Sequence, residues 1–190
     1  MKKNQSLVAA VLMLFVVAIT ACSSPQKKLS DEIEAKEKSL YGDSTMVPDA
    51  GKAKEVITLY VKYADEFPED TASASYLFKA GDVSSKINET QQAIEIFGRL
   101  IQKYPEHSNA PFALFLQGFI YENQVGDPAK ARPYYESFLK KYPDHPIASD
   151  VSFSLENLGK TPEQLIQEFE SKSQDQELSS GDSTKVSTAK

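Results

Sequence analysis

The chain has 190 residues, of which 41% are hydrophobic and 25% charged, a balance that is ordinary for a globular protein and excludes a fibrous or wholly disordered chain. This length suits one folded domain with a single hydrophobic core. The formal net charge is -6 and no run of Lys or Arg exceeds two residues, so the chain lacks the basic face that a nucleic-acid partner requires.

The first residues have the pattern of a secretory signal peptide. Two lysines precede an unbroken apolar run over residues 7–19, which ends shortly before Cys22. Thirteen apolar residues suit the core of a signal peptide but fall short of the roughly 20 that a membrane-spanning helix needs. We therefore predict that residues 1–21 are a signal peptide. Its removal would leave 19 Lys and Arg against 27 Asp and Glu, a net charge of -8.

The four residues from Ile19 to Cys22 resemble a lipobox, the motif of bacterial lipoproteins in which the cysteine is diacylated and becomes the new N-terminus. Small residues before the cysteine let the peptidase approach, and only a thiol can form the thioether. Cys22 is the only cysteine, so it can form no internal disulfide. We predict that a lipid on Cys22 anchors the chain to a membrane, since two or three acyl chains bind stably where one is marginal. An ordinary secretory signal that ends near a cysteine is the alternative.

Serine occupies the two positions after Cys22. In Gram-negative lipoproteins, Asp at the first of these positions favours retention in the inner membrane, so the resemblance implies export to the outer membrane of a Gram-negative cell envelope. An anionic membrane surface would repel the negatively charged mature chain, so attachment would depend on the lipid. We expect the protein to face the periplasm rather than the exterior.

The two ends of the mature chain are polar. Residues 22–48 are predicted to be a lipid-anchored tether with one weakly amphipathic helix, Ser30 to Leu40. Residues 171–190 have one Leu, one Val and otherwise polar or small residues, too little to offset the entropy of ordering, so we predict a disordered polar tail. The folded domain is then expected over residues 49–170.

Three segments of this domain have apolar residues at the i, i+3, i+4, i+7 spacing of one buried helix face. Asp127 and Thr161, each followed by proline, match the N-cap signal of further helices, and Asn88 and Ser108 are well placed to cap two more. No stretch alternates at period two, so we predict an all-α domain of about seven helices. The three apolar segments run over residues 53–67, 93–104 and 131–142.

A short phrase recurs three times in the domain, with prolines at positions 68, 105 and 143. The spacings of 37 and 38 residues hold two short helices and two turns, which is the unit length of a helical solenoid. The repeat therefore predicts antiparallel helix pairs stacked in register.

The pattern inside the units resembles the tetratricopeptide repeat, in which a small residue lets neighbouring helices approach, an aromatic residue fills the gap and a proline ends the second helix. This chain departs from the consensus at Ser84, where a Tyr is expected, and in a period longer than 34 residues. We predict two good repeats, flanked by a unit before Pro68 that shows only its second half and a degenerate unit after Pro143. The resemblance rests on Leu77, Gly81, Ala93, Phe97 and Pro105, and on Leu114, Gly118, Tyr121, Ala131, Tyr135 and Pro143.

Together, the lipobox and the repeats resemble the BamD and YbgF (CpoB) group of lipoproteins, whose repeats also carry an aromatic-proline phrase at the helix end. BamD itself is longer, and the resemblance is not specific to one member. The group serves outer-membrane protein assembly or cell-wall coordination. The resemblance therefore implies a protein-protein interaction adaptor whose partner is an envelope protein or peptide segment.

In a tetratricopeptide stack the first helix of each unit lines the concave surface, and Phe78, Phe115 and Phe153 occupy one position of successive units. One interpretation is an apolar groove for a peptide or helix, because aromatic residues are enriched at binding hot spots. The other is that these rings pack between helices or under the C-terminal helix from Pro162 to Glu170, and for Phe153 we favour the core. The predicted partner-binding groove, with its polar rim, is formed by Phe78, Asp82, Lys86, Phe112, Phe115, Phe119 and Glu122.

No enzyme motif is recognisable, since the chain lacks G-x-S-x-G, the P-loop and G-x-G-x-x-G. His107 and His145 follow the proline phrase at the same place in successive units, which favours a turn or cap role over a metal site. We expect a protein without catalytic activity, cofactor or metal. One alternative to an adaptor is a surface lipoprotein that binds a small ligand or glycan through the same aromatic face, and another is a lipoprotein enzyme.

Overall fold

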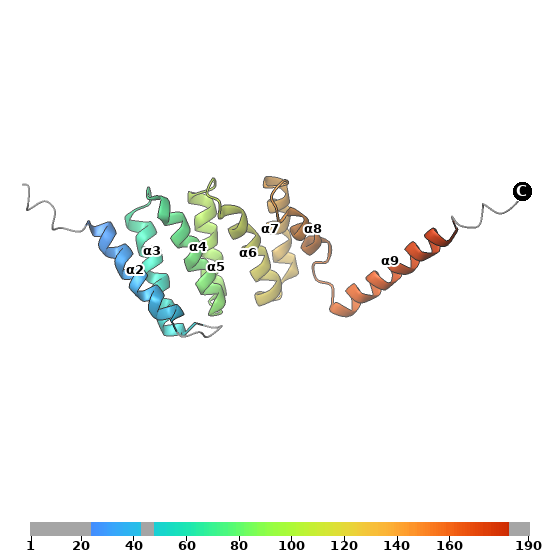
Figure 1. Cartoon of the computed structure of the whole chain (residues 1–190), viewed down its shortest axis with the longest axis horizontal. Coiled ribbons are helices and arrows are strands. Elements are labelled where there is room, and N and C mark those ends of the chain that lie inside the picture. Colours follow the sequence, from blue (N-terminus) through green and yellow to red (C-terminus); the bar gives the residue numbers. More distant parts are fainter. Residues whose placement is uncertain (1–23, 43–47, 183–190) are drawn as a thin grey trace, which may run out of the picture. The chain divides into compact units, whose positions relative to one another are not determined.

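The structure, a computed structural model, describes residues 24–42 and 48–182, with side chains up to Ser173. The predicted signal peptide and Cys22 lie outside the described residues. Within the described ranges the chain forms α-helices and a π-helical segment, and no strand. The elements are α2 (Pro25–Tyr41), α3 (Ala50–Glu66), α4 (Thr71–Lys86), α5 (Thr90–Lys103), α6 (Ala110–Ile120), η1 (Tyr121–Val125), α7 (Pro128–Lys141), α8 (Ala148–Glu156) and α9 (Pro162–Asp182) (Figure 1).

The chain divides into two compact units, residues 1–113 and 114–190, and the division falls within α6. The described part of the first unit holds α2 to α5, in which each helix packs against the next one along the chain (Figure 1). In the second unit, α7 packs against both η1 and α8. The all-α class and the helical-solenoid architecture predicted from the sequence are confirmed.

The buried helix faces follow the predicted periodicity. In α3 the buried residues include Val56, Ile57 and Tyr60, and α5 buries Phe97 and Leu100 in the same way. Helix α7 buries Ala131, Tyr135 and Phe138. These three helices end just before the aromatic-proline phrases, where Phe67, Tyr104 and Tyr142 are the C-caps.

Helix α2 differs from the tether that the sequence predicts for residues 22–48. It begins at Pro25, and the Ser24 hydroxyl accepts a hydrogen bond from the backbone N–H of Lys27. Its three buried residues, Leu29, Ile33 and Leu40, belong to the side that packs against α3. The segment therefore supplies the first helix of the repeat that ends at Pro68. The sequence of α2 has at most about one apolar residue per turn on this side. So narrow an apolar stripe did not predict that the helix packs against α3.

Three turns between the first and second helix of a pair, those after α4, η1 and α8, contain one residue with positive φ: Asn88 at 60°, Gly126 at 71° and Gly159 at 82°. The prediction that Asn88 caps a helix is wrong, because Glu89 occupies the N-cap of α5. Asn88 instead provides the left-handed backbone, which Asn adopts more readily than most residues.

The caps predicted at Asp127 and Thr161 are confirmed, whereas α6 begins at Ala110, so that Asn109 and not Ser108 directly precedes it. The Asp127 carboxylate accepts the backbone N–H of Lys130 at 3.0 Å. Thr161 and Gln164 form a reciprocal capping box, in which the Thr161 hydroxyl accepts the Gln164 N–H and the Gln164 side chain accepts the Thr161 N–H.

Helix α9 continues to Asp182, so it includes part of the segment that the sequence predicts as a disordered tail over residues 171–190. The Ser171 and Ser173 hydroxyls donate to the carbonyls of Glu168 and Phe169, one turn back. A low apolar content predicts disorder, but Gln, Glu and Lys in the segment also favour a helix. Across the described residues, each helix is too short or too polar to cross a membrane.

Candidate functional site

In two repeats, a glycine of the first helix lies directly under an aromatic ring of the second. A Cβ atom on Gly81 would lie 2.6 Å from the Phe97 ring, and one on Gly118 would lie 2.6 Å from the Tyr135 ring. Both rings are fully buried. The two helices of each repeat therefore approach to a distance that only glycine permits at these positions.

The predicted groove residues Phe78 and Phe115 pack onto the same two rings. The ring centroids of Phe78 and Phe97 are 5.7 Å apart, and those of Phe115 and Tyr135 are 5.9 Å apart. Both phenylalanines remain partly exposed. Phe78 and Phe115 therefore each pack against the second helix of their own repeat and also contribute to the surface.

The predicted groove residues divide between the two units. Phe78, Asp82 and Lys86 lie on α4, and Lys86 donates to the Asp82 carboxylate at 2.6 Å. This bond raises the pKa of Lys86. The two charged side chains therefore neutralise each other, as an i,i+4 pair on one helix surface does.

The phenylalanines of the predicted groove with the largest exposed fractions are on α6. Phe112, at the end of the first unit, is 39% exposed, and Phe119, in the second unit, is 41% exposed. The centroids of Phe115 and Phe119 are 6.0 Å apart. Glu122, predicted as part of the polar rim, accepts a hydrogen bond from the Tyr135 hydroxyl at 2.6 Å, so it ties η1 to the core of α7.

A cluster of tyrosines, absent from the sequence predictions, joins α2, α3 and α4 in the first unit. Glu37 accepts hydrogen bonds from the Tyr60 hydroxyl at 2.5 Å and from Lys79 at 2.7 Å. The Lys79 ammonium lies 5.8 Å from the centroid of the Tyr60 ring and 5.6 Å from that of Tyr76. Burial raises the pKa of Glu37, but the hydrogen bonds from Lys79 and Tyr60 outweigh it, so the pKa lies below the usual Glu value.

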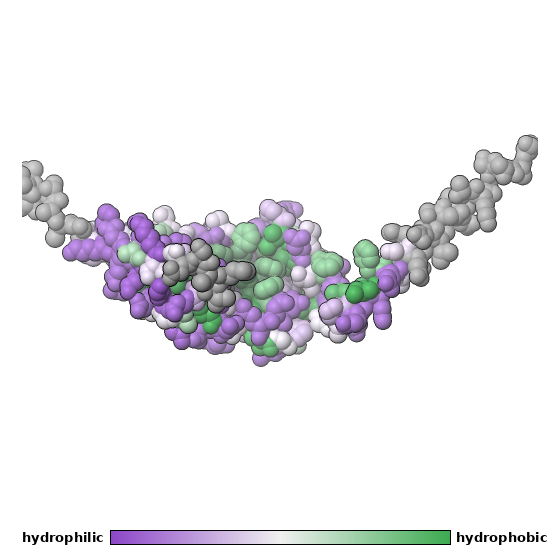
Figure 2. Space-filling view, turned by 60° about the horizontal axis from the view of Figure 1, so that its bottom comes forward, coloured by the Kyte–Doolittle hydropathy of each residue, from purple (hydrophilic) through white to green (hydrophobic). Residues whose placement is uncertain are grey.

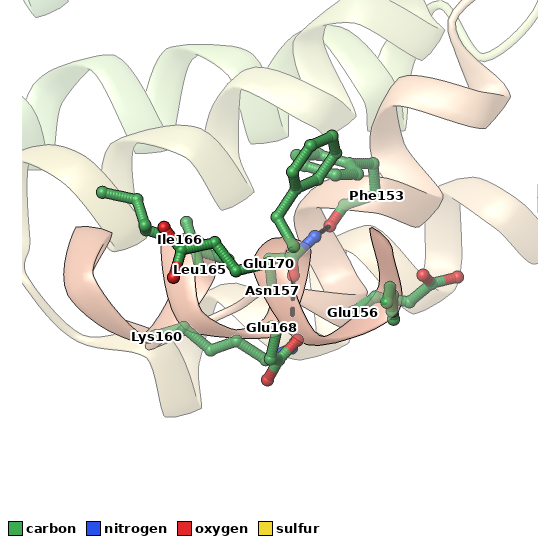
Figure 3. A pocket seen from close by; sticks show the side chains of 10 residues that line it. Phe153, Glu156, Asn157, Lys160, Leu165, Ile166, Glu168 and Glu170 are labelled. Carbon is green, nitrogen blue, oxygen red and sulfur yellow. Dashed lines mark hydrogen bonds and ion pairs between the residues drawn. The ribbon is translucent and has the colours of Figure 1, made fainter. Parts of the chain in front are cut away.

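A cleft in the second unit separates α8 from α9 and has a volume of about 550 Å³. Phe153 contributes from α8, and Leu165 and Ile166 contribute from α9 (Figure 3). Phe169 of α9 also lines the cleft. The expectation that Phe153 packs in the core is wrong, because its side chain is 65% exposed. Apolar surface gathers near the start of α9, beside polar residues (Figure 2). The periodicity of apolar residues could not predict this cleft. An apolar stripe predicts that one face of a helix is buried, but it does not identify the element that covers that face.

The two histidines have the turn role predicted for them. The His107 ring accepts the backbone N–H of Asn109 at 3.1 Å, and the His145 ring accepts that of Ile147 at 3.4 Å. Both side chains therefore stabilise the turn after the aromatic-proline phrase. Among the residues that the structure describes, His, Cys, Asp and Glu are nowhere grouped in threes or more in a way that could hold a metal ion.

Two segments of the chain, residues 75–107 and 112–145, match the family model described as Tetratricopeptide repeat. They fall on the α4–α5 and α6–α7 helix pairs, so the two good repeats predicted from the sequence are confirmed. No curated protein matches the chain.

Proposed function

We propose that this helical protein of the tetratricopeptide-repeat type is a lipoprotein of the outer membrane, anchored through a lipid on Cys22. Its repeat domain would act as an adaptor that binds another protein of the cell envelope, in a role like that of the BamD and YbgF (CpoB) group. The repeats support a binding role rather than catalysis. The resemblance of residues 19–22 to a lipobox supports the anchor.

The observation that carries the adaptor proposal is the exposure of two phenylalanines on α6. Phe112 and Phe119 are 39% and 41% exposed, on the first helix of a matched repeat. Exposing such rings to water costs free energy that a protein partner can recover by covering them. In this type of repeat, the first helix contributes to the surface that receives partner segments.

Crosslinking in cells tests the adaptor role. A photoreactive residue at position 119 is expected to give discrete protein adducts, and the same residue at the exposed position Lys103 of α5 gives none above background. Saturable binding of a small glycan to the purified protein, combined with no adduct at position 119, would contradict the adaptor and support the ligand-binding alternative.

Metabolic labelling with palmitate tests the anchor separately. The native chain should take up label and sediment with outer membranes, and Cys22→Ser should lose both properties. Label that persists in Cys22→Ser, or an unlabelled native chain, would contradict lipidation without bearing on the repeat domain.

A further inference from the structure

The third helix pair, α8 and α9, departs from the two matched repeats in the length of its first helix. In the α6–α7 repeat, the first helix begins at Ala110 and the N-cap of the second is Asp127. In the third pair these positions are Ala148 and Thr161, four residues closer together. Four residues are about one helical turn, and the π-helical segment η1 has no counterpart between α8 and α9. Helix α9 therefore begins one turn early relative to α8.

This shift changes which residues face each other across the pair. In an antiparallel pair, residues at equal distances from the turn lie opposite each other. In the α4–α5 repeat, Gly81 is eight residues before the N-cap Glu89 and Phe97 is eight residues after it, and the glycine lies against the ring. Phe153 is eight residues before Thr161, and Phe169 is eight residues after it. At the distance from the turn where the α4–α5 repeat has glycine, the third pair thus has a large ring.

Two rings cannot occupy the space that one ring fills over a glycine. Phe97 and Tyr135 are fully buried at 0% exposure, whereas their counterpart Phe169 is 75% exposed and Phe153 is 65% exposed. Both rings line the cleft of about 550 Å³ between the helices. Its volume lies within the range of sites that bind ligands or the side chains of a partner.

The charged residues around the cleft favour a basic partner. Lys160 donates to the Glu168 carboxylate at 2.6 Å, so these two charges neutralise each other. The other charged residues of the lining are Glu156, Glu170 and Lys172, which leaves a surplus of negative charge. The whole chain has the same sign, with a net charge of -6.

Neither α2 nor α9 of a second copy of this chain suits the cleft. The apolar side of α2 is already buried on α3, and its outer surface carries the ion pairs Lys27–Asp31 and Lys38–Glu34, so a head-to-tail copy would present charges to an apolar cleft. The sequence of α9 after Glu170 has one large apolar residue, Leu178, so two copies of α9 would share a very short apolar stripe.

The first unit shows how one helix of this fold receives another against aromatic and apolar side chains. Helix α3 is covered by α2 on one side and by α4 on the other. At the α3–α4 junction, Tyr76 stacks on Tyr60 at 5.4 Å, beside the buried Leu77. We propose that the α8–α9 cleft is a docking site for an amphipathic α-helix of another protein, which inserts apolar side chains between Phe153 and Phe169 and carries basic residues at its flanks.

Three fluorescent synthetic peptides of about 18 residues test this proposal against the full chain in detergent micelles. The first has Leu and Phe at i, i+3, i+4 and i+7 with flanking lysines, the second has the same composition in scrambled order, and the third has Glu in place of Lys. By fluorescence anisotropy, the first peptide is expected to bind at least about ten-fold more tightly than the other two. Equal binding of the first and second peptides would overturn the proposal, because the amphipathic order of the side chains would then make no difference.

Paired variants locate the site. Ile166→Ser with Phe169→Ser should weaken binding of the first peptide by about ten-fold or more, and Phe112→Ser with Phe119→Ser should leave it unchanged. All four side chains are substantially exposed, so circular dichroism should remain native. The reverse result would overturn the cleft proposal while leaving the proposed adaptor surface on α6 intact. A native dimer that becomes monomeric only in the Ile166 and Phe169 variant would overturn it too, because a second copy would then be the occupant.

Discussion

Gly118 and Tyr135 are in contact across the two helices of one repeat, and the tyrosine ring occupies the space that any side chain at position 118 would need. The same relation joins Gly81 to Phe97 in the preceding repeat. The two glycines thus set the distance between the helices. In the third pair, Phe153 and Phe169 both line a cleft between α8 and α9 instead.

Gly118→Ala should lower the free energy of unfolding by about 1–3 kcal/mol, because its Cβ would lie 2.6 Å from the buried Tyr135 ring. The midpoint of urea unfolding, followed by circular dichroism, measures the change. Gly51→Ala in α3 is the matched control, since its Cβ would approach only the Asp49 carboxylate and Ala favours a helix. A loss for Gly118→Ala no larger than that for Gly51→Ala would show that the ring can move aside.

The parts of the fold that could be predicted from the sequence depend on local patterns. The buried faces of α3, α5 and α7 follow from periodicity, and the caps Asp127 and Thr161 follow from a polar residue before proline. Helix α2 could not be predicted as part of the fold. Its few apolar residues, Leu29, Ile33 and Leu40, are buried only because α3 packs against them, and the local sequence does not indicate that contact.

The candidate site was predicted only in part, for a related reason. The phenylalanines of α4 and α6 could be identified by their spacing, but spacing does not reveal that Phe78 and Phe115 also pack on the second helices of their own repeats. Phe153 occupies the same repeat position and is nevertheless exposed. Its environment depends on where α9 begins, which is a property of the loop length rather than of the repeat pattern.

Gly126 is expected to tolerate Asn better than Ala. Its φ of 71° is in the left-handed region, and a Cβ at this position would meet no atom within 4 Å, so the cost of substitution comes from the backbone alone. Gly126→Ala should lower the free energy of unfolding by about 1–2 kcal/mol. Gly126→Asn should cost clearly less, as Asn88 occupies the equivalent turn of the preceding repeat. Equal losses for Ala and Asn would contradict this account.

Tyr135→Phe should destabilise the second unit by about 1–2 kcal/mol, because the part-buried Glu122 carboxylate loses the hydroxyl that donates to it at 2.6 Å. Burial, followed by the bond to Glu122, raises the pKa of Tyr135, so the hydroxyl remains a donor throughout the neutral range. Tyr104→Phe makes the same chemical change at an exposed bond to the Pro68 carbonyl and should cost less than about 0.5 kcal/mol. Thermal unfolding compares the two, and similar losses would mean that Glu122 finds water instead.

Glu37→Gln should reduce stability at neutral pH and lose its effect in acid. Burial raises the pKa of the Glu37 carboxyl, but the hydrogen bonds from Lys79 and Tyr60 lower it further, so the folded state favours the charged form. That stabilisation is complete above the pKa of the unfolded chain, about 4.3, and is lost as the pH falls through the lower pKa of the folded state. Urea midpoints measured from about pH 7 to about pH 3 should therefore converge for the native chain and the variant. Glu34→Gln, which removes an exposed ion pair with Lys38, should change little at any pH. A gap between native and Glu37→Gln that stays constant in acid would mean that the side chain acts by packing, and not by its charge.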